Sequence, residues 1–424
     1  MIKNKENKWN TTHIGEIAEV KGGKRLPKSK LVGDEETNHP YIRVVDFAAD
    51  GVNSANLKYI DDETHSAISR YTISENDVYI SIAGTIGRVG IVPTNLSGAN
   101  LTENAAKICD IDSSMDKRFL MYFLRSRVGQ SYIKSQIVGT SQPKLALFRI
   151  KEIEVPRPPL STQHEIASIL SAYDDLIENN TRRIRILEEM AQSLYREWFV
   201  HFRFPGHEKV KLVSSSLGQI PEGWEVAPVS DLFEIIGGGT PSKKVEEFWT
   251  KGEINWFVPS DLTASKTMFM EQSKKRITEL GLRKSSARLF PANSVMLTSR
   301  ATIGVVAMNT ETACTNQGFI TCIPNETVLT FFLYHWLLEN KDTFLSLASG
   351  ATFKEISKGV FRTIDFLLPA KAIVNQFEEF IRPVGEQILN LQRRNANLRY
   401  IRDLLLPKLI TGVVDVSNVL EDVI

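Results

Sequence analysis

The stretch WEVAPVSDLFEIIGG, from Trp224 to Gly238, repeats the outline of WNTTHIGEIAEVKGG, from Trp9 to Gly23. Both stretches place aliphatic residues five and eight positions after the tryptophan and end on paired glycines, and the shift of 215 residues that relates them also carries Asp46 onto Asp261. Similar shifts relate Thr85-Ile86-Gly87 to Thr302-Ile303-Gly304, Phe119-Leu120 to Phe332-Leu333, and Gln163 to Gln376. Since the shift is about half of the 424 residues, the chain is a tandem duplication, which suits the reading of two sites on one extended ligand.

The composition is typical of a soluble globular protein with more than one domain. Hydrophobic residues make up 42% and charged residues 24%, and the longest apolar stretch, Phe331–Leu338, is too short for a membrane span. The first eight residues lack an apolar core, so we expect no signal peptide. Three cysteines without metal-ligand spacing (Cys109, Cys314 and Cys322) favour a reduced, cytoplasmic chain.

Each half begins with a globular stretch, residues 8–158 and 216–370. Short β-like runs such as Val78–Ile82 and Val295–Thr298 alternate with turn signals, and helix-like patches cover Lys117–Arg127 and Thr330–Glu339. This mixture predicts an α+β domain with a largely antiparallel sheet in each half.

A long helix is predicted to follow each globular stretch, one starting near Ser161 and the other near Ala372. Their apolar positions alternate in steps of four and three, which is a heptad seam. The first seam comprises Tyr173, Ile177, Asn180, Ile184, Leu187, Ala191, Leu194 and Trp198, and the second comprises Val384, Ile388, Leu391, Asn395, Leu398 and Leu405. Pro383 is expected to kink or restart the second helix, and Gly412 to end it.

Charge and seam composition favour an antiparallel coiled-coil pair of these helices. Residues 161–199 carry four basic and seven acidic side chains, whereas residues 371–411 carry seven basic and four acidic ones. Each seam holds one asparagine, Asn180 or Asn395, and a buried polar seam residue sets register at the expense of stability. The alternative, in which each helix docks only on its own domain, stays open.

Motifs for catalysis are missing. The chain has no phosphate-binding loop and no histidine pair with metal spacing. It also lacks the Asn/Asp-Pro-Pro-Tyr/Phe signature of a methyltransferase that acts on amino groups. We therefore predict no catalytic and no metal-binding residues. The run Gly237-Gly238-Gly239-Thr240-Pro241 is expected to form a turn, and His335 is expected to be a core histidine.

Positive charge is clustered although the net charge is only +1. Residues 21–30 hold five basic side chains and no acid, and residues 273–300 hold seven basic side chains and one acid. Such clusters indicate either a phosphate footprint or a solvated loop face.

These features together resemble the specificity (S) subunit of Type I restriction–modification systems. The resemblance covers almost the whole chain and is carried by four pieces in order: Leu194–Val200 leading to Phe204-Pro205-Gly206, Leu217–Val226, Gly237–Ser242 with Trp249 and Trp256–Leu262, and Ala301–Gly304 with Cys314–Phe319. The first half departs from this pattern at Gly22–Pro27 and at Ala83-Gly84, which leaves the transfer of individual contacts weak.

The resemblance implies two target-recognition domains, residues 1–160 and 207–371, and two spacer helices, residues 161–206 and 372–424 with the tail. Each domain would read one half of a bipartite, asymmetric double-stranded DNA target. The helices would set the spacer and dock two modification (M) subunits, which hold S-adenosylmethionine and methylate adenine. Restriction (R) subunits, which use ATP and Mg²⁺, would add the nuclease, so this chain would be a non-catalytic cytoplasmic reader without a cofactor or a membrane segment.

Base readout requires arginine, lysine or amide side chains on loops beside the basic clusters, although most such contacts go to phosphates. Asp46, Ser260 and Asp261 are instead expected to cap turns, and Trp9, Trp198 and Trp224 to be packing anchors. The candidate DNA-binding residues are Lys24, Arg25, Arg43, Arg88, Ser141, Gln142, Lys144, Lys243, Lys274, Lys275, Arg300, Thr352 and Lys354.

Two other functions compete with this one. A coiled-coil scaffold that holds two protein-binding domains would show no steep salt dependence of DNA affinity. A self-sufficient methyltransferase would bind S-adenosylmethionine as an isolated chain.

Overall fold

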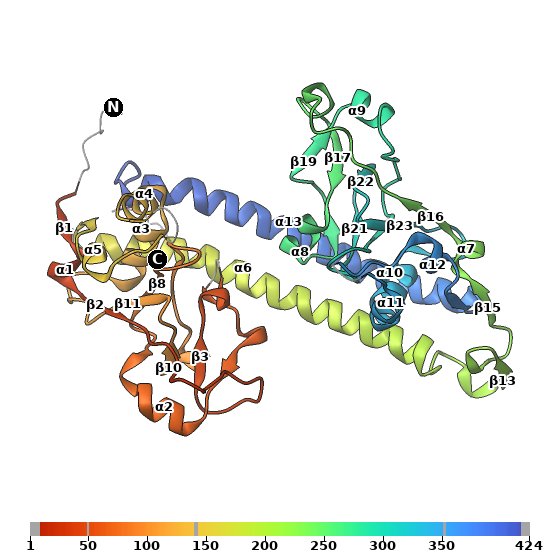
Figure 1. Cartoon of the computed structure of the whole chain (residues 1–424), viewed down its shortest axis with the longest axis horizontal. Coiled ribbons are helices and arrows are strands. Elements are labelled where there is room, and N and C mark those ends of the chain that lie inside the picture. The colour runs from red at the N-terminus through yellow and green to blue at the C-terminus, as the bar shows by residue number, and fades with distance from the viewer. Residues whose placement is uncertain (1–8, 49–50, 140–142, 351–352, 417–424) are drawn as a thin grey trace. The chain divides into compact units, whose positions relative to one another are not determined.

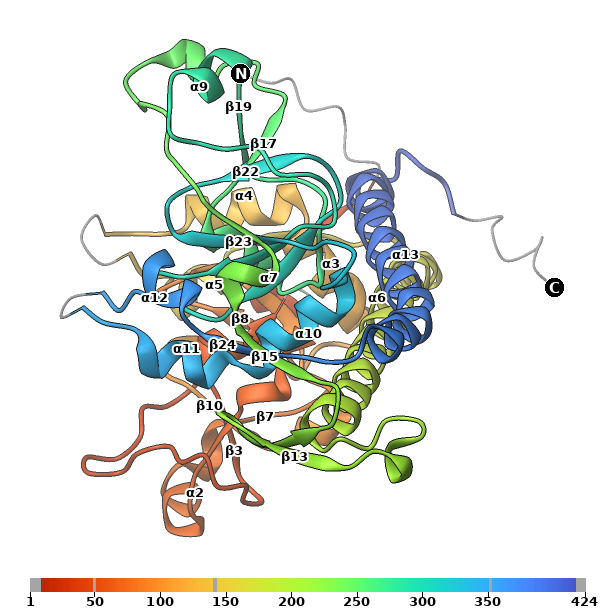
Figure 2. The ribbon, with the colours of Figure 1, turned by 90° about the vertical axis from the view of Figure 1, so that its right-hand side faces the viewer.

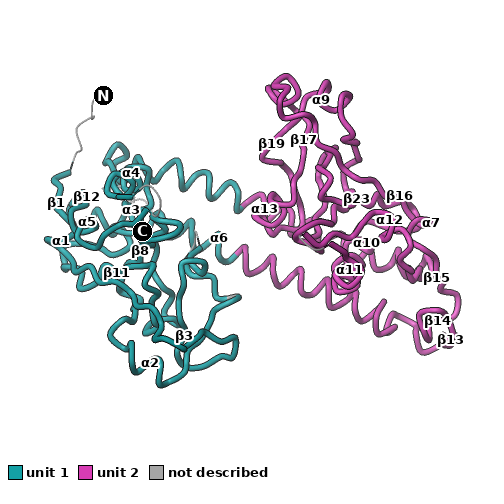
Figure 3. Tube along the Cα trace, viewed as in Figure 1, with its two compact units in different colours: residues 1–179, 395–424 teal, residues 180–394 magenta. Residues whose placement is uncertain are grey.

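The computed structural model describes residues 9–48, 51–139, 143–350 and 353–416 (Figure 1). The chain divides into two compact units (Figure 3). Unit 1 contains Met1–Asn179 and Asn395–Ile424, and unit 2 contains Asn180–Arg394. The boundaries fall inside the two long helices, α6 (Leu160–Tyr195) and α13 (Lys371–Ile410), so each helix contributes to both units.

Unit 1 contains an antiparallel sheet in the order β2-β11-β8-β9 and a second sheet in the order β6-β3-β10-β7, in which β3 and β10 are parallel. A short pair, β1 with β12, lies at the junction with α6. The strands are β1 (Thr11–His13), β2 (Glu19–Gly22), β3 (Pro40–Ile42), β4 (Phe47–Ala48), β5 (Gly51–Val52), β6 (Lys58–Tyr59), β7 (Thr72–Ile73), β8 (Val78–Ser81), β9 (Val89–Ile91), β10 (Ala99–Leu101), β11 (Ala105–Cys109) and β12 (Glu154–Pro156), and β4 pairs with β5. The helices are α1 (Ile14–Ile17), α2 (Asp62–Ile68), α3 (Lys117–Arg125), α4 (Arg127–Ser135) and α5 (Leu147–Lys151).

Unit 2 repeats this topology with a sheet in the order β16-β23-β20-β21-β18 and a second sheet in the order β19-β17-β22. The strands are β13 (Leu212–Ser215), β14 (Gly218–Pro221), β15 (Glu225–Pro228), β16 (Glu234–Gly237), β17 (Ile254–Phe257), β18 (Phe269–Met270), β19 (Lys275–Ile277), β20 (Val295–Thr298), β21 (Val306–Asn309), β22 (Ala313–Thr315), β23 (Phe319–Ile323) and β24 (Asp365–Leu368). The helices are α7 (Val229–Leu232), α8 (Pro259–Ser265), α9 (Glu279–Arg283), α10 (Thr330–Glu339), α11 (Lys341–Leu347) and α12 (Lys358–Arg362).

The duplication seen in the sequence is also a duplication of strand pairing. β17 pairs with β22 in parallel and with β19 in antiparallel orientation, just as β3 pairs with β10 and β6. β15 pairs with β24 as β1 pairs with β12. The predicted α+β class with two similar domains is therefore confirmed, and each unit has a largely antiparallel main sheet.

One helix is buried on nearly all sides in each unit. In α10, seven consecutive residues from Phe331 to Leu337 are buried, and in α3 six consecutive residues from Phe119 to Leu124 are buried. A helix that is apolar all round belongs in a protein interior. α10 lies between the main sheet of unit 2 and the long helices (Figure 2), and Phe332 packs on Tyr195 of α6.

The long helices pair with each other inside both units, in antiparallel orientation in unit 1. There Arg402 of α13 forms an ion pair with Asp174 of α6, while Asn395 donates to the Ile177 carbonyl (3.3 Å). In unit 2, Phe377 of α13 packs edge-on against Tyr195 with the ring centroids 5.9 Å apart. The alternative in which each helix docks only on its own domain is therefore wrong.

Two predicted breakpoints in α13 have different outcomes. The helix continues through Pro383, so a restart at this residue is wrong, whereas a kink there stays a prediction. Pro383 is exposed, and the buried Ile381 and Ile388 pack against unit 2 on either side of it. The helix ends at Ile410, and Gly412 adopts a left-handed conformation with φ of 70°, as expected of a glycine stop signal.

Candidate nucleic-acid interface

Unit 1 brings together two loops that the sequence singled out separately. The turn between β8 and β9 meets the loop that follows α4, because the Leu145 N–H donates to the Ile82 carbonyl (3.0 Å) and Ala83 bridges to Lys144. Val138 and Lys144 exchange backbone hydrogen bonds of 3.2 and 3.1 Å, which closes the loop into a hairpin. Lys144 is exposed at its base.

Unit 2 builds the same arrangement from the turn between β20 and β21 and the loop that follows α11. The Ala301 N–H donates to the Lys354 carbonyl (2.9 Å), and the Ile356 N–H donates to the Ser299 carbonyl (3.0 Å). Ser349 and Glu355 exchange backbone hydrogen bonds of 3.0 and 2.8 Å. The matched loops of the two halves therefore occupy matched positions, and Arg300 and Lys354 lie together in the second one.

Both turns require a left-handed residue, which explains a substitution between the halves. Gly84 has φ of 72° in unit 1, and Ala301 has φ of 61° at the matched position in unit 2. Glycine adopts this conformation freely, whereas alanine is strained in it. Ala301 therefore stores strain at the point where Arg300 and Lys354 meet.

Two candidate arginines of unit 1 are already held by the protein. Arg43 binds both carboxylate oxygens of the buried Asp46, with Nε–Oδ2 of 3.0 Å and Nη2–Oδ1 of 2.8 Å, and these bonds raise its pKa. Arg88 donates from Nη1 to the carbonyls of Val44 (3.2 Å) and Phe47 (2.8 Å). Both guanidinium groups therefore fix the segment around Val44, and Arg43 Nη2 also donates to the Asn56 carbonyl (3.0 Å).

The predicted caps behave alike in the two halves. Asp46 accepts a hydrogen bond from the Arg43 N–H (2.8 Å), and Asp261 accepts one from the Val258 N–H (3.0 Å). Each carboxylate therefore starts the short helical turn that follows the matched strands β3 and β17.

The other basic candidates differ between the units. Lys24 lies over the ring of Tyr71, 5.4 Å from its centroid, and Arg25 forms an ion pair with Glu103 (2.8 Å). In unit 2, Lys243, Lys274 and Lys275 are exposed, and within the described part of the chain they have no ion-pair partner. Ser141, Gln142 and Thr352 lie outside the described residues.

The two seam asparagines are placed differently. Asn395 is buried and donates from Nδ2 to the Ile177 carbonyl across the helix pair (3.3 Å). Asn180 is only partly buried on α6. The role of both residues in register stays a prediction.

Two further side chains position the helices, and the contacts they make had no sequence signal, since their partners lie elsewhere in the chain. Gln163 accepts from the Asp116 N–H (2.8 Å) and donates to the carbonyls of Ser114 and Pro158 (both 2.9 Å). Glu378 of α13 accepts from the N–H of Phe331 (3.1 Å) and so caps α10. Only Gln163 was marked beforehand, by its repeat at Gln376.

The glycine-rich run does not form the predicted turn: Gly237 ends β16, and the segment continues beside β22, where the Gly239 N–H donates to the Thr315 carbonyl (2.9 Å). A Cβ atom on Gly238 would lie 2.0 Å from the Asn316 carbonyl oxygen, so glycine is required where this segment passes the neighbouring backbone. Among the described residues there is no group of three or more histidine, cysteine, aspartate or glutamate side chains able to hold a metal ion. No described helix combines the length and the hydrophobicity needed to cross a membrane.

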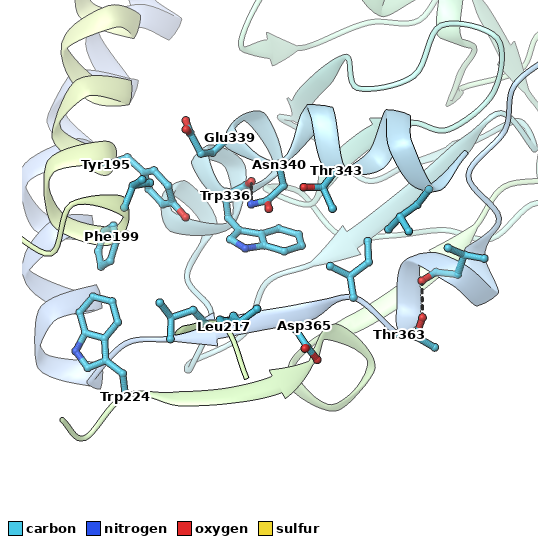
Figure 4. Close-up of a pocket in the computed structure, with 15 residues that line it drawn as sticks. Tyr195, Phe199, Leu217, Trp224, Trp336, Glu339, Asn340, Thr343, Thr363 and Asp365 are labelled. Carbon is cyan, nitrogen blue, oxygen red and sulfur yellow. Dashed lines mark hydrogen bonds between the residues drawn. The ribbon is translucent and has the colours of Figure 1, made fainter. Parts of the chain in front are cut away.

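A cavity of about 600 Å³ in unit 2 is lined mainly by aromatic and aliphatic side chains (Figure 4). Tyr195, Trp224 and Trp336 form part of its wall. The Glu339 carboxylate there is bound by Gln192 Nε2 and Arg196 Nε, each at 2.7 Å. The cavity is thus an opening in the core around α6.

His335 belongs to the same core, as the sequence predicted. It is 1% exposed, its Nδ1 lies 2.8 Å from Gln192 Oε1, and burial lowers its pKa to about 3. A histidine held neutral in this way contributes to packing.

Comparison with known proteins identifies the family to which the chain belongs. The model of the Type I restriction modification DNA specificity domain matches residues 6–189 and 221–399. The specificity subunit of the Type I restriction enzyme MjaIX from Methanocaldococcus jannaschii is 25% identical over 97% of this chain and 94% of its own length. The HindI specificity subunit from Haemophilus influenzae is 25% identical over 85% of this chain and 90% of its own length.

A solved structure shares the fold. The S subunit of a Type I restriction–modification system from M. genitalium matches with a TM-score of 0.56 and 17% identity, over 96% of this chain and 98% of that one. A family model that covers both halves, relatives matched over nearly their whole length and a common fold lead to one assignment: the chain belongs to the Type I restriction–modification DNA specificity family.

Proposed function

We propose that this chain is the DNA-reading subunit of a Type I restriction–modification complex, and that each unit reads one half of a bipartite, asymmetric target. The observation that carries the proposal is the matched pair of loops, one around Lys144 and one around Lys354, that two topologically equivalent units present. Equivalent scaffolds whose loops carry different side chains suit the reading of two different half-sites.

The outer faces of α6 and α13 support the docking of modification subunits. Each helix carries exposed apolar residues beside the seam; Leu176 and Met190, for example, lie one position before the buried seam residues Ile177 and Ala191. In unit 1 these residues are Leu176, Ile401 and Leu404, and in unit 2 they are Ile186, Met190 and Phe380. Exposed apolar stripes on long helices are suited to helices of partner proteins.

The chemistry is assigned to the partners. The two modification subunits would bring S-adenosylmethionine and transfer the methyl group to adenine, and the restriction subunits would bring ATP and Mg²⁺. This chain would supply sequence choice and spacing. We expect the complex in the cytoplasm, where its DNA is.

The division of labour is tested by methyl transfer. The purified chain alone should transfer no methyl group to DNA, and the chain mixed with its modification subunit should methylate adenine within one bipartite sequence. Methyl transfer by the chain alone would support the methyltransferase alternative. DNA affinity without salt dependence would support the scaffold alternative.

The assignment of one half-site to each unit is tested by exchange. Replacing residues 216–370 with those of a relative should change one half of the methylated sequence and leave the other half unchanged. If both halves change together, the units do not read separately.

A further inference from the structure

The two units differ in the charge of one pair of equivalent elements. In unit 1 the edge strand β6 leads into α2, and in unit 2 the edge strand β19 leads into α9. β6 and β19 occupy equivalent positions in their sheets. β6 pairs in antiparallel orientation with β3, which pairs in parallel with β10. In the same way, β19 pairs in antiparallel orientation with β17, which pairs in parallel with β22. Differences between these two edges therefore reflect side chains on a common frame.

The edge in unit 2 is strongly basic. It carries six exposed basic side chains, and among the described residues none of them has a carboxylate within ion-pair distance. These six residues, here called the β19–α9 edge, are Lys274, Lys275, Arg276, Arg283, Lys284 and Arg288. The nearby acids include Glu279 in the first turn of α9 and Glu246 and Glu247 in the 3-10 turn packed against it, and Glu271 is paired with Arg393 (2.7 Å).

The scaffold under these charges has its own core. Trp256 and Ile277 are buried between the three-stranded sheet and the segment around α9, and Trp249 packs edge-on against Trp256 with centroids 5.0 Å apart. Lys275 Nζ lies over the Trp249 ring, 6.0 Å from its centroid. In Figure 1, β17, β19 and α9 stand beyond the five-stranded sheet of unit 2. The basic side chains are therefore displayed on an ordered support.

The equivalent edge in unit 1 is compensated. Lys58 of β6 forms an ion pair with Asp34, and the first turn of α2 is acidic. Lys30 binds both Glu63 (2.6 Å) and Asp61 (3.2 Å), so the neighbouring basic loop is neutralised by these carboxylates. Basic side chains that are already paired with carboxylates contribute little to phosphate binding.

We propose that the β19–α9 edge of unit 2 is the main phosphate-binding surface of the chain and that unit 1 has no equivalent of it. Unpaired cations on DNA-binding proteins replace the counterions of the phosphates, which produces salt-dependent affinity without sequence choice. The proposal rests on the proposed DNA-reading function and adds to it that backbone attachment is unequal between the two half-sites.

The test uses the full chain assembled with its modification subunits. The variant of the β19–α9 edge, called the lobe variant below, is K274Q/K275Q/R276Q. The matched control in unit 1 is K28Q/K30Q/K58Q, which removes the same charge. The readout is the slope of the logarithm of DNA affinity against the logarithm of salt concentration. Each lost phosphate contact lowers the slope by about 0.9, so the lobe variant should lose about 2 to 3 and the control at most about 1.

Two further readouts separate phosphate binding from other roles. The charge-retaining variant K274R/K275R should keep the slope, and the lobe variant should methylate the original sequence in both halves. An unchanged slope, an equal loss in the control, or a changed half-site in the lobe variant would each overturn the phosphate-binding surface. A wild-type complex whose DNA affinity has no salt dependence would instead overturn the proposed function itself.

Discussion

Glu188 shows how a single half-buried side chain makes the stability of unit 2 depend on pH. It lies on α6 and lines a cavity of about 420 Å³ together with Tyr334 and His335. Burial, with a smaller effect of the Glu189 carboxylate, raises the pKa of Glu188 to about 7 from an ordinary value of 4.5. Between these two values the folded chain holds a proton that the unfolded chain has released, so stability falls as pH rises through this window.

Glu188→Gln should remove this pH dependence. We expect the free energy of unfolding of the variant to match that of the wild type near pH 4.5 and to exceed it by up to about 3 kcal/mol at pH 8. Denaturant unfolding at a series of pH values measures the difference, and Glu189→Gln is the control on the exposed neighbour. A gap that is constant over this range would show that Glu188 is charged in the folded chain throughout.

Ala301→Gly should relieve the strain in the turn between β20 and β21 of unit 2. The residue has φ of 61°, and glycine tolerates this conformation. The gain is reduced by the greater freedom of glycine in the unfolded chain, which leaves a stabilisation of roughly 0.5 to 1 kcal/mol. Thermal unfolding measures it. The reciprocal change Gly84→Ala, with open space around its Cβ position, should cost a similar amount; a stable Gly84→Ala would contradict the argument.

At the scale of elements, local signals in the sequence predicted far more than long-range ones. The heptad seams located both long helices, whose first residues, Leu160 and Lys371, lie one position from those predicted. Of the two alternatives predicted at Pro383, the restart is wrong and the kink stays a prediction; packing of Ile381 and Ile388 compensates for the missing N–H donor and keeps the helix continuous. The cap that Glu378 gives α10 had no signal, since its partner lies 47 residues away in the chain.

Asn395→Leu tests the seam. The change replaces a buried amide and its 3.3 Å hydrogen bond to Ile177 with apolar surface, so we expect the helix pair to gain roughly 1 kcal/mol and to hold its register less sharply. Thermal unfolding reports the first effect, and the spread of spacer lengths in the methylated sequences reports the second. Asn397→Leu, at an exposed position of the same helix, is the control. Lower stability with a sharp spacer would argue against a seam position.

At the scale of the whole molecule, the duplication could be recognised in the sequence, whereas the surroundings of the individual basic residues could not. Repeated motifs such as Thr85–Gly87 and Thr302–Gly304 revealed two equivalent units. Whether a basic residue is free or paired depends on acids elsewhere, as with Arg25 and Glu103. This is why Lys24, Arg25 and Arg43 looked equal to Lys274 and Lys275 in the sequence but have different surroundings in the structure.

Lengthening both long helices should lengthen the DNA spacer. One heptad inserted after Leu187 and another near Leu389 keeps the seam in phase and adds about 10.5 Å, the length of about 3 base pairs. The methylated sequence should keep both half-sites and gain a longer spacer, less whatever DNA distortion absorbs the added twist. Sequencing of methylated adenines measures the outcome. An insertion in only one helix should abolish methylation, and an active double variant with the original spacer would show that the helices do not set the distance.

The division of the units along the chain has a consequence for synthesis on the ribosome. Unit 2 is one continuous segment, Asn180–Arg394, whereas unit 1 also needs Asn395–Ile424, which is made only after unit 2. At roughly 5 to 20 residues per second, the amino-terminal part of unit 1 waits about 10 to 40 s for its missing helix. During that time Ile166, Leu170 and Ile177 have no partner from α13, so the first half translated is the last to fold.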